Sequence, residues 1–485
     1  MSSIVGTLFT NKTYGRDKKG RVLYLCISDT HIDKPFLVPF TNPTDKAFNK
    51  TPTNYYVVFT PLCNITLHGH PVGQLMDCLG SVNDWTAYSK YELFKRNLYG
   101  TGFKIFDQGV AEAVAFGNTD PKGNTDPKGV VNAVASGVVN NPIISIDPQG
   151  CTDIDDAFCF FISDNKAYLQ IHIANVPAYM EENNLWNFIT DRATTVYMPT
   201  GKVPMLPKQL SENACSLLEG TIKPTFMITY TFAYNPKTHA IEKLLEKSSP
   251  TATFAYIQKN YTYEDTIDNQ SLLFEAARLM EPSQIVNNTH DLIAVFMMAF
   301  NKACAPMTPI FRNCFSNNNN SNSGDAAFNY GLQTFTASYS TSCEGHATFD
   351  GTRYTHITSP IRRLVDLVNM TAILYGTAHP FVQTWLTRIE HINNYCKQAR
   401  KAQQNAELYK LLSTSDAEPI YEGIYIKGTD VVYLIELRLF VYVGKNQMLF
   451  EGKSWYRIYM FHKEHTLKRK IRIMPLQNND DTCLL

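Results

Sequence analysis

The sequence predicts an α+β protein in which a mixed middle region is flanked by two small β-barrels. Short β-rich runs separated by turn residues occupy residues 1–95, and a second β-rich segment follows Ala417. Between them, residues 130–412 alternate strand-like and helix-like stretches. Short strands with turn chemistry between them are typical of small barrels, whereas a mixture of strands and helices is typical of an α+β domain.

The individual elements follow from local composition. Apolar runs rich in β-branched and aromatic residues predict strands, and helical periodicity predicts helices. The expected N-terminal strands are Val22–Ile27, Tyr55–Phe59 and Gln74–Gly80. The expected helices of the middle region are Asp291–Ala303 and Leu386–Leu412. The expected C-terminal β runs are Tyr421–Ile426, Val431–Val443 and Trp455–Met460.

Two segments predict loops. The hexapeptide Asn-Thr-Asp-Pro-Lys-Gly occurs twice in tandem at residues 118–129, and such turn-forming residues indicate a surface connection between domains. The Asn- and Ser-rich stretch at residues 316–324 is of low complexity and has no apolar residue to bury. We assign neither segment a role in binding.

Composition narrows the class of protein. With 485 residues, 44% of them hydrophobic, the chain can bury a large core and form several domains. The eleven cysteines contain no Cys-x-x-Cys pair, so they predict neither a disulfide framework nor a zinc site. The formal net charge of zero excludes a uniformly basic nucleic-acid binder but allows a local basic groove.

Targeting signals are not recognisable in the sequence. The apolar stretches Ala294–Phe300 and Val431–Val443 are too short or too interrupted by charge to span a bilayer. The N-terminal residues Met1-Ser-Ser-Ile do not begin a signal peptide. We therefore expect a cytoplasmic protein without a membrane partner.

The most informative feature is a cluster of acids. Asp147, Asp153, Asp155 and Asp156 lie within ten residues, and no Lys or Arg occurs between Lys128 and Lys166. Pro148 and Gly150 turn the chain, and the apolar runs on both sides predict buried strands. Carboxylates held close together repel one another unless they share protons, face solvent or bind a cation. The pattern therefore indicates a metal site.

The ligand types indicate which metal. Oxygen ligands without His or Cys favour Mg²⁺ or Mn²⁺. A calcium EF-hand would need Gly at the sixth and Glu at the twelfth position of its loop, and counting from Asp147 or from Asp153 gives neither. The alternative is an Asp-rich turn with solvated side chains.

A second constellation lies in the segment Tyr354-Thr-His-Ile-Thr-Ser-Pro-Ile-Arg-Arg363, followed by Asp366. Two arginines behind a Ser-Pro turn can present a guanidinium group to a phosphate. An arginine pair at the start of a helix is also common on a solvated or salt-bridged surface. Only together with a metal site does this segment point to phosphate chemistry.

The acidic segment resembles the signature of the RNB family of exoribonucleases, which includes bacterial RNase II and RNase R and their eukaryotic exosome-linked relatives. The segment from Tyr354 to Asp366 resembles that family's second signature. Two further stretches match in order, His172-Ile-Ala-Asn-Val176 and the region from Thr194 to Leu217. The resemblance covers about residues 140–412.

The resemblance implies a domain order and an activity. It implies a cold-shock-like OB-fold that binds RNA at 1–100, a connector at 101–140, an RNB catalytic domain at 141–415 and an OB-type RNA-binding domain at 416–485. The implied activity is processive 3′-to-5′ hydrolysis of single-stranded RNA to nucleoside 5′-monophosphates, with little sequence preference. Two Mg²⁺ or Mn²⁺ ions would assist the displacement, as in other two-metal nucleases. We expect a monomer, and the sequence indicates no protein partner.

The resemblance also implies residue roles. Asp147, Asp153 and Asp156 would hold metal, Asp155 would be essential to the chemistry, and Arg362 would contact the scissile phosphate. Arg363 would bind substrate, or alternatively pair with Asp366 as support.

Aromatic and histidine residues were assigned in the same way. Tyr197 would stack near the 3′-terminal nucleotide, and Tyr256 would pack against its sugar. A position in the core or at an interface is the alternative for each tyrosine. His172 and His346 fall in matching segments, and we expect both to be structural.

One position departs from the family pattern. The family carries a Glu that helps to recognise the ribose 2′-hydroxyl on the helix where this chain has Val295. Discrimination between RNA and DNA would therefore be weakened, unless Asp291, one turn earlier, partly substitutes. Two alternative functions follow: a catalytically weak RNA-binding member of the family, and a nuclease with relaxed RNA/DNA discrimination.

Overall fold

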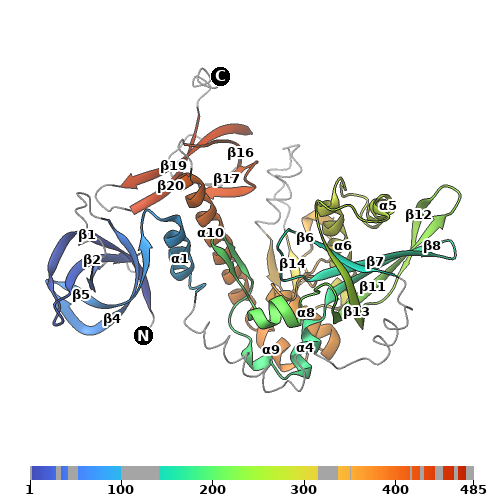
Figure 1. The fold of residues 1–485 in the computed structure, drawn as a ribbon, viewed down its shortest axis with the longest axis horizontal. Helices are drawn as coiled ribbons and strands as arrows, with labels where there is room; N and C mark the ends of the chain where they lie inside the picture. Colours follow the sequence, from blue (N-terminus) through green and yellow to red (C-terminus); the bar gives the residue numbers. More distant parts are fainter. Residues whose placement is uncertain are drawn as a thin grey trace.

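The computed structural model describes residues 3–28, 34–41, 53–99, 141–314, 337–349, 351–414, 418–426, 431–442, 452–463 and 468–476. The expected connector at 101–140 and the polar loop at 316–324 lie outside these residues. An N-terminal β-barrel lies at one end of the molecule and a larger α/β unit at the other, with the long helix α10 between them (Figure 1). A C-terminal β-sheet lies beside one end of α10.

The N-terminal unit is a closed five-stranded barrel with strand order β1-β2-β3-β5-β4. Its interior is lined by alternate apolar residues such as Leu8, Val38 and Phe59, all fully buried. Closure removes the free edges that an open sheet of this size would expose. Its strands are β1 Ile4–Arg16, β2 Val22–Ser28, β3 Phe36–Phe40, β4 Tyr55–Leu67 and β5 His70–Ser81.

The larger unit is built on a six-stranded sheet with order β12-β11-β13-β6-β7-β8. Because β11 also pairs with β8, strands β6, β7, β8, β11 and β13 pair in a ring. The β13–β6 pair is parallel, and the other pairs in this sheet are antiparallel. The strands are β6 Ile143–Asp147, β7 Asp156–Ser163, β8 Lys166–Ala174, β11 Ile222–Asn235, β12 Ala240–Lys247 and β13 Thr251–Thr262.

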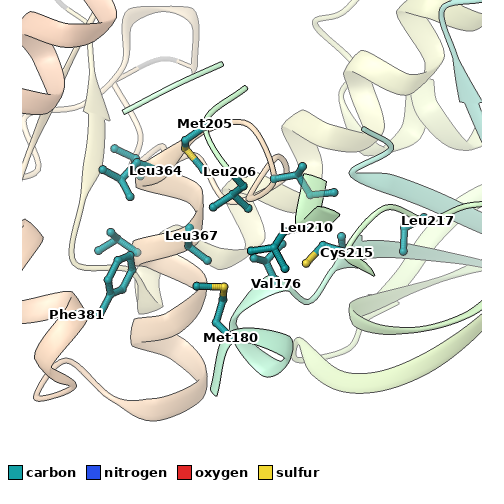
Figure 2. Close-up of a cluster of buried hydrophobic side chains, with 14 of the residues drawn as sticks. Val176, Met180, Met205, Leu206, Leu210, Cys215, Leu217, Leu364, Leu367 and Phe381 are labelled. Atoms are coloured by element: carbon teal, nitrogen blue, oxygen red, sulfur yellow. The ribbon is translucent and has the colours of Figure 1, made fainter. Parts of the chain in front are cut away.

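Two apolar cores lie on the two faces of this sheet. On β7, Ala157 and Cys159 belong to one core and Phe158 to the other, as the two-residue period of a strand requires. Figure 2 shows the first core, where helices α4 and α8 meet the segment from Met205 to Leu217. The helices of the unit are α4 Val176–Glu182, α5 Gln270–Met280, α6 Thr289–Cys304, α8 Leu364–Tyr375, α9 Pro380–Leu386 and α10 Ile389–Thr414. A short pair, β14 Phe311–Asn313 and β15 Ser338–Ser340, completes it.

Helix α10 connects the units. Helix α1 (Trp85–Lys95) packs along it, where the rings of Tyr88 and Tyr409 stack at 4.1 Å and Asn405 donates to the buried carboxylate of Glu92 at 3.0 Å. A short hairpin, β9 Val196–Met198 and β10 Gly201–Val203, packs against the same two helices through a shared apolar cluster. Helix α1, helix α10 and the β9–β10 hairpin therefore share one core.

The C-terminal unit is a five-stranded antiparallel sheet with order β18-β17-β16-β19-β20. The expected run 431–443 divides into β17 and β18, because the chain reverses between them and Arg438 adopts a positive φ of 52°. The strands are β16 Ile420–Ile426, β17 Val431–Leu434, β18 Leu439–Tyr442, β19 Lys453–Lys463 and β20 Lys468–Pro475.

The α+β class with small β units flanking a mixed domain is confirmed. The two expected helices correspond to α6 and α10 within a few residues at each end. The domain boundaries remain predictions. Among the described helices, none combines the length and the apolar run needed to cross a membrane.

His172 generates a prediction about stability. It lies on β8, 2% exposed, with Nδ1 3.0 Å from the hydroxyl of Thr225, and burial lowers its pKa to about 4. Because the folded-state pKa lies below the unfolded value of about 6.5, this group's contribution to stability is complete above pH 6.5 and is lost as the pH falls toward 4. We expect this group to cost about 1.4 kcal/mol per pH unit in that interval.

Urea unfolding of wild type and His172→Gln between neutral pH and about pH 4.5 measures this effect. The variant should lose less stability on acidification than wild type. Equal pH dependence of the two proteins would show that His172 is not buried in its neutral form.

Candidate active site

The four acids lie on a turn that is fixed by backbone contacts. Strand β6 ends at Asp147, and the N–H of Cys151 donates to the carbonyl of Pro148 at 3.0 Å. Gly150 has a φ of 77°, which glycine adopts without strain. The hydroxyl of Ser216 accepts from the N–H of Ile154 and donates to the carbonyl of Thr152, both at 3.0 Å. The turn is thereby held against the segment that contains Ser216.

Burial raises the proton affinity of Asp147, Asp155 and Asp156. Asp155 is 2% exposed, and Asp153 and Asp156 are each 8% exposed. Burial raises the pKa of Asp147 and raises that of Asp156 well above its usual range, and the charge of Asp147 adds to the effect on Asp156. Burial also raises the pKa of Asp155 to about 7, although Arg362 opposes the shift. The acids therefore form an electrostatically coupled cluster.

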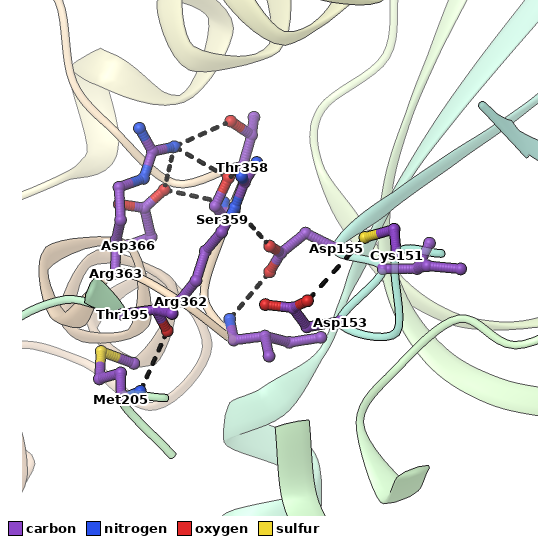
Figure 3. A network of polar contacts seen from close by, with 12 residues as sticks. Cys151, Asp153, Asp155, Thr195, Met205, Thr358, Ser359, Arg362, Arg363 and Asp366 are labelled. Atoms are coloured by element: carbon purple, nitrogen blue, oxygen red, sulfur yellow. Dashed lines mark hydrogen bonds and ion pairs between the residues drawn. The ribbon is translucent and has the colours of Figure 1, made fainter. Parts of the chain in front are cut away.

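Arg362 lies directly against this cluster. Its Nε is 2.9 Å from Oδ2 of Asp155, while the N–H of Ile361 donates to Oδ1 of the same carboxylate at 2.9 Å (Figure 3). The Arg362–Asp155 contact is an ion pair without a well-directed N–H, since Oδ2 has no aligned hydrogen-bond donor. The Arg362 side chain is 44% exposed. A buried acid thus holds one edge of a guanidinium group whose remainder reaches solvent.

Arg363 points to a different acid. Its Nη2 lies 2.8 Å from Oδ1 of Asp366, a fully buried carboxylate that also accepts from the N–H of Ser359 at 2.8 Å. The alternative pairing predicted for Arg363 is therefore present. The Arg363 side chain is 28% exposed.

A neighbouring segment anchors the two arginines. The N–H of Thr195 donates to the carbonyl of Arg362 at 2.9 Å, and the N–H of Leu364 donates to the carbonyl of Ala193 at 3.0 Å. The hydroxyl of Thr195 accepts from the N–H of Met205 at 3.0 Å. The first two bonds join the arginine segment to the chain just before Tyr197, and the third ties that chain to Met205, so two segments far apart in sequence form one wall of the site.

Asp153 is paired with a cation that the sequence analysis missed. The ammonium group of Lys202 lies 2.7 Å from Oδ1 of Asp153, and the hydroxyl of Tyr197 donates to Oδ2 at 3.2 Å. The charge of Asp153 helps to raise the pKa of Lys202 against the opposing effect of burial. Lys202 and Tyr197 face each other across the β9–β10 hairpin. Residues paired across a hairpin point to the same face of it. The expected hairpin pairing of Lys202 with Tyr197 is therefore the signal that could have identified Lys202.

Tyr256 does not lie where the sequence analysis expected it, and Tyr263, which was not predicted, lies near the acids instead. Tyr256 is half-buried on β13 and pairs with Ile222, about 20 Å along the strand from Thr262 at about 3.3 Å per residue. Thr262 is the residue that pairs with Asp147, so Tyr256 is not brought to the acids. Tyr263 follows β13 at the acidic end, and burial together with Asp156 and Asp147 raises its pKa to about 12. Only the parallel β13–β6 register would have identified Tyr263.

The remaining candidates lie outside the cluster. Val295 is 1% exposed and packs in the core on the α6 side of the sheet. Asp291, in the first turn of α6, accepts from the N–H of Asn287 at 3.1 Å. His346 packs against the rings of Phe349 and Tyr354, which agrees with a structural role.

Two of the acids suit a divalent ion. Oδ2 of Asp147 is buried without a hydrogen-bond partner, and the donors are hard carboxylate oxygens. Within the described residues, no group of three or more His, Cys, Asp or Glu side chains is arranged to hold a metal ion. Mg²⁺ commonly uses only one or two protein carboxylates and takes its other ligands from water and substrate phosphates. Asp147 and Asp156 therefore fit such an ion, whereas Asp153 is already paired.

Sequence comparison points to the same class of domain. Residues 138–265 match the family described as RNB domain, which agrees with the resemblance predicted from the sequence. The chain is 37% identical over 94 residues to ribonuclease R of Ureaplasma parvum, which is 19% of this chain and 13% of that protein. It is 34% identical over 114 residues to exoribonuclease 2 of Vibrio parahaemolyticus, 20% of this chain and 17% of that protein.

Solved structures show the same fold over nearly the whole chain. The apo form of Mycoplasma genitalium RNase R matches with a TM-score of 0.66 at 14% identity, covering 97% of this chain and 90% of that one. The same enzyme is also known in complex with ribose-methylated single-stranded RNA. Yeast Ssd1, described as a pseudonuclease, matches with a TM-score of 0.58 at 15% identity, covering 95% of this chain and 68% of that one.

The Arg363–Asp366 pair supports a stability prediction. Replacing Asp366 by Asn leaves Arg363 largely buried without its counter-charge, and breaking a buried pair in this way costs about 3–5 kcal/mol. Since Arg363 is 28% exposed, solvent screens it in part, and we expect a smaller cost of about 2–3 kcal/mol. Urea unfolding of the two proteins at neutral pH measures the difference.

The exposed pair of Arg388 and Asp191 provides the matched control. It has the same 2.8 Å distance between Nη2 and Oδ1, but Asp191 is 71% exposed. Asp191→Asn should cost no more than about 1 kcal/mol because solvent screens exposed pairs. If both substitutions had equal effects, burial would not be what makes the Asp366 pair important.

Proposed function

We propose that this protein is a divalent-metal-dependent exoribonuclease that hydrolyses single-stranded RNA from the 3′ end to nucleoside 5′-monophosphates. The observation that carries the proposal is the buried acidic cluster with the exposed guanidinium group of Arg362 at its edge. Phosphodiester hydrolysis needs both a place for hard cations and a donor for the phosphate oxygens. The RNB domain match gives these residues a nuclease context.

Asp147 and Asp156 are the residues that would hold Mg²⁺ or Mn²⁺. When bound, the ion would activate water and stabilise the charge on the phosphate and on the leaving 3′ oxygen. Burial raises the pKa of both carboxyl groups more than the charge of Arg362 lowers it, and a bound divalent ion would lower both. The arrangement with two ions remains a prediction.

Arg362 is the residue that would bind the scissile phosphate. Asp155 contacts its Nε and the hydroxyl of Ser359 lies 3.2 Å from one Nη, while the exposed part of the guanidinium group can reach a ligand. A guanidinium group held in this way donates to phosphate oxygens without first having to become ordered. Asp155 is thus expected to orient Arg362, and its loss should impair phosphate binding and turnover together.

Tyrosines would hold the RNA. Tyr197 is 42% exposed beside Asp153, so one face of its ring is available for stacking on a base. Stacking on an aromatic ring is tolerant of sequence, which suits processive degradation without base preference. Tyr263, close to Asp147 and Asp156, is better placed than Tyr256 for the nucleotide at the cluster. Arg363 would support Arg362 from its pair with Asp366.

A catalytically weak RNA-binding protein is the main alternative, since a neighbour in fold is described as a pseudonuclease. This chain retains four carboxylates in a buried site, where each one destabilises the fold unless it is compensated. Retention of such a costly cluster favours an enzyme. The monomeric state and cytoplasmic location expected from the sequence remain predictions.

The central test uses single-stranded RNA labelled at its 5′ end, with Mg²⁺ or with EDTA. We expect shortening from the 3′ end with Mg²⁺ and none with EDTA. Arg362→Met should lower the rate by about 10²–10³-fold, because one preorganised donor to the phosphate is lost. Asp155→Asn should lower it as well, since Arg362 loses its counter-charge.

Asp191→Asn serves as the control, because Asp191 is exposed and pairs with Arg388 away from the acids. Its rate should equal that of wild type. If wild type with Mg²⁺ leaves the RNA intact, the enzyme interpretation fails and the RNA-binding alternative gains support. Accumulation of intermediates of every length would contradict processivity.

Relaxed discrimination between RNA and DNA is a second candidate property, favoured by the burial of Val295 in the core. A site built to bond a hydroxyl rejects the analogue that lacks it by about 10⁴-fold or more. We expect a much smaller ratio of RNA to DNA turnover here. Matched RNA and DNA oligomers measure it.

The same assay with Asp291→Ala tests whether Asp291 substitutes for the missing Glu. A strong preference for RNA that is lost only in this variant would support substitution. A strong preference in both proteins would contradict the weakened discrimination and the substitution alike.

A further inference from the structure

The ammonium group of Lys202 contacts three side-chain oxygen atoms at the acidic cluster. Its ammonium nitrogen lies 2.7 Å from Oδ1 of Asp153, 2.7 Å from the hydroxyl of Thr152 and 3.0 Å from Oε1 of Glu212. An ammonium group has three donors, and each one has a partner here. Because Tyr197 donates to the other oxygen of Asp153, both oxygens of that carboxylate are occupied by the hairpin.

The hairpin that carries Lys202 is firmly anchored. On β9 and β10, Val196, Met198 and Val203 point into the apolar cluster shared with α1 and α10. Tyr197 and Lys202 occupy the intervening positions and therefore point to the opposite face. The Lys202 side chain is only 20% exposed. Moving its ammonium group away from Asp153 would require the long side chain to leave three oxygens or the hairpin to leave its core.

We propose that Lys202 is the resident cation of the acidic cluster, occupying beside Asp153 the place that a second divalent ion would need. The site then takes a single divalent ion, held by Asp147 and Asp156. This inference rests on the proposed metal-dependent function and departs from the two-ion arrangement predicted from the sequence. A fixed ammonium group and a divalent ion at the same carboxylate repel each other, so each excludes the other.

The proposal is tested by titrating the full chain with Mn²⁺ near neutral pH, without RNA, and following free Mn²⁺ by electron paramagnetic resonance. Wild type should bind one equivalent. Lys202→Met, which keeps the length of the side chain and removes its charge, should bind two. Lys208→Met is the matched control, because Lys208 is exposed on the neighbouring segment, and it should bind one.

A second pair of variants tests the same point without changing Lys202. Asp153→Asn should leave the affinity for the single Mn²⁺ within about twofold of wild type, whereas Asp156→Asn should weaken it by about tenfold or more. This comparison keeps the proposal testable even if Lys202→Met fails to fold, which circular dichroism would reveal.

Three results would overturn the proposal. Wild type could bind two equivalents, Lys202→Met could still bind one, or Asp153→Asn could lose the ion as completely as Asp156→Asn. Failure of the proposed function is seen separately in the RNA assay. A protein that binds one Mn²⁺ as expected but leaves RNA intact would refute the nuclease activity and leave the role of Lys202 standing.

Discussion

The need to compensate buried carboxylates is the constraint on which the rest of the site depends. Asp155 and Asp366 are both almost completely removed from solvent, and each is paired with one of two consecutive arginines. Because an uncompensated buried charge is strongly unfavourable, these two pairs determine where the arginine segment can lie. These two ion pairs also give the two arginines different surroundings. Arg362 keeps an exposed face for a ligand, whereas Arg363 is tied to the start of α8.

The acidic turn and the outer units are mechanically connected through the β9–β10 hairpin. One face of the hairpin packs on α1 and α10, and the other carries Tyr197 and Lys202 to Asp153. Helix α1 follows the N-terminal barrel, and α10 also reaches the C-terminal sheet. A shift of either β unit on α10 would therefore reach Asp153 through a short chain of packed side chains.

Much of the fold was predictable because its signals are local. Apolar β-rich runs identified β2, β4 and β5 of the N-terminal barrel but missed β1 and β3, and helical periodicity located α6 and α10. The reversal at Arg438 was missed because Ile435 and Leu437 alternate with Glu436 and Arg438 through the turn, and one continuous strand would show the same alternation. The pairing of β8 with β11, which closes the five-stranded ring, was not predictable, since pairing between distant strands has no local signal.

The sequence by itself determined the acid types, their spacing and the presence of an arginine pair, and these predicted a cation site beside a phosphate-binding group. Their chemistry is a property of the residues and needs no fold to be recognised. Only the tertiary structure decided which cation each acid meets. Lys202 and Arg362 are absent from the acidic segment and arrive from a hairpin and a helix start. Tyr263 rather than Tyr256 reaches the acids because the β13–β6 register selects it. Such choices depend on long-range packing, which sums many weak contacts that no single segment contains.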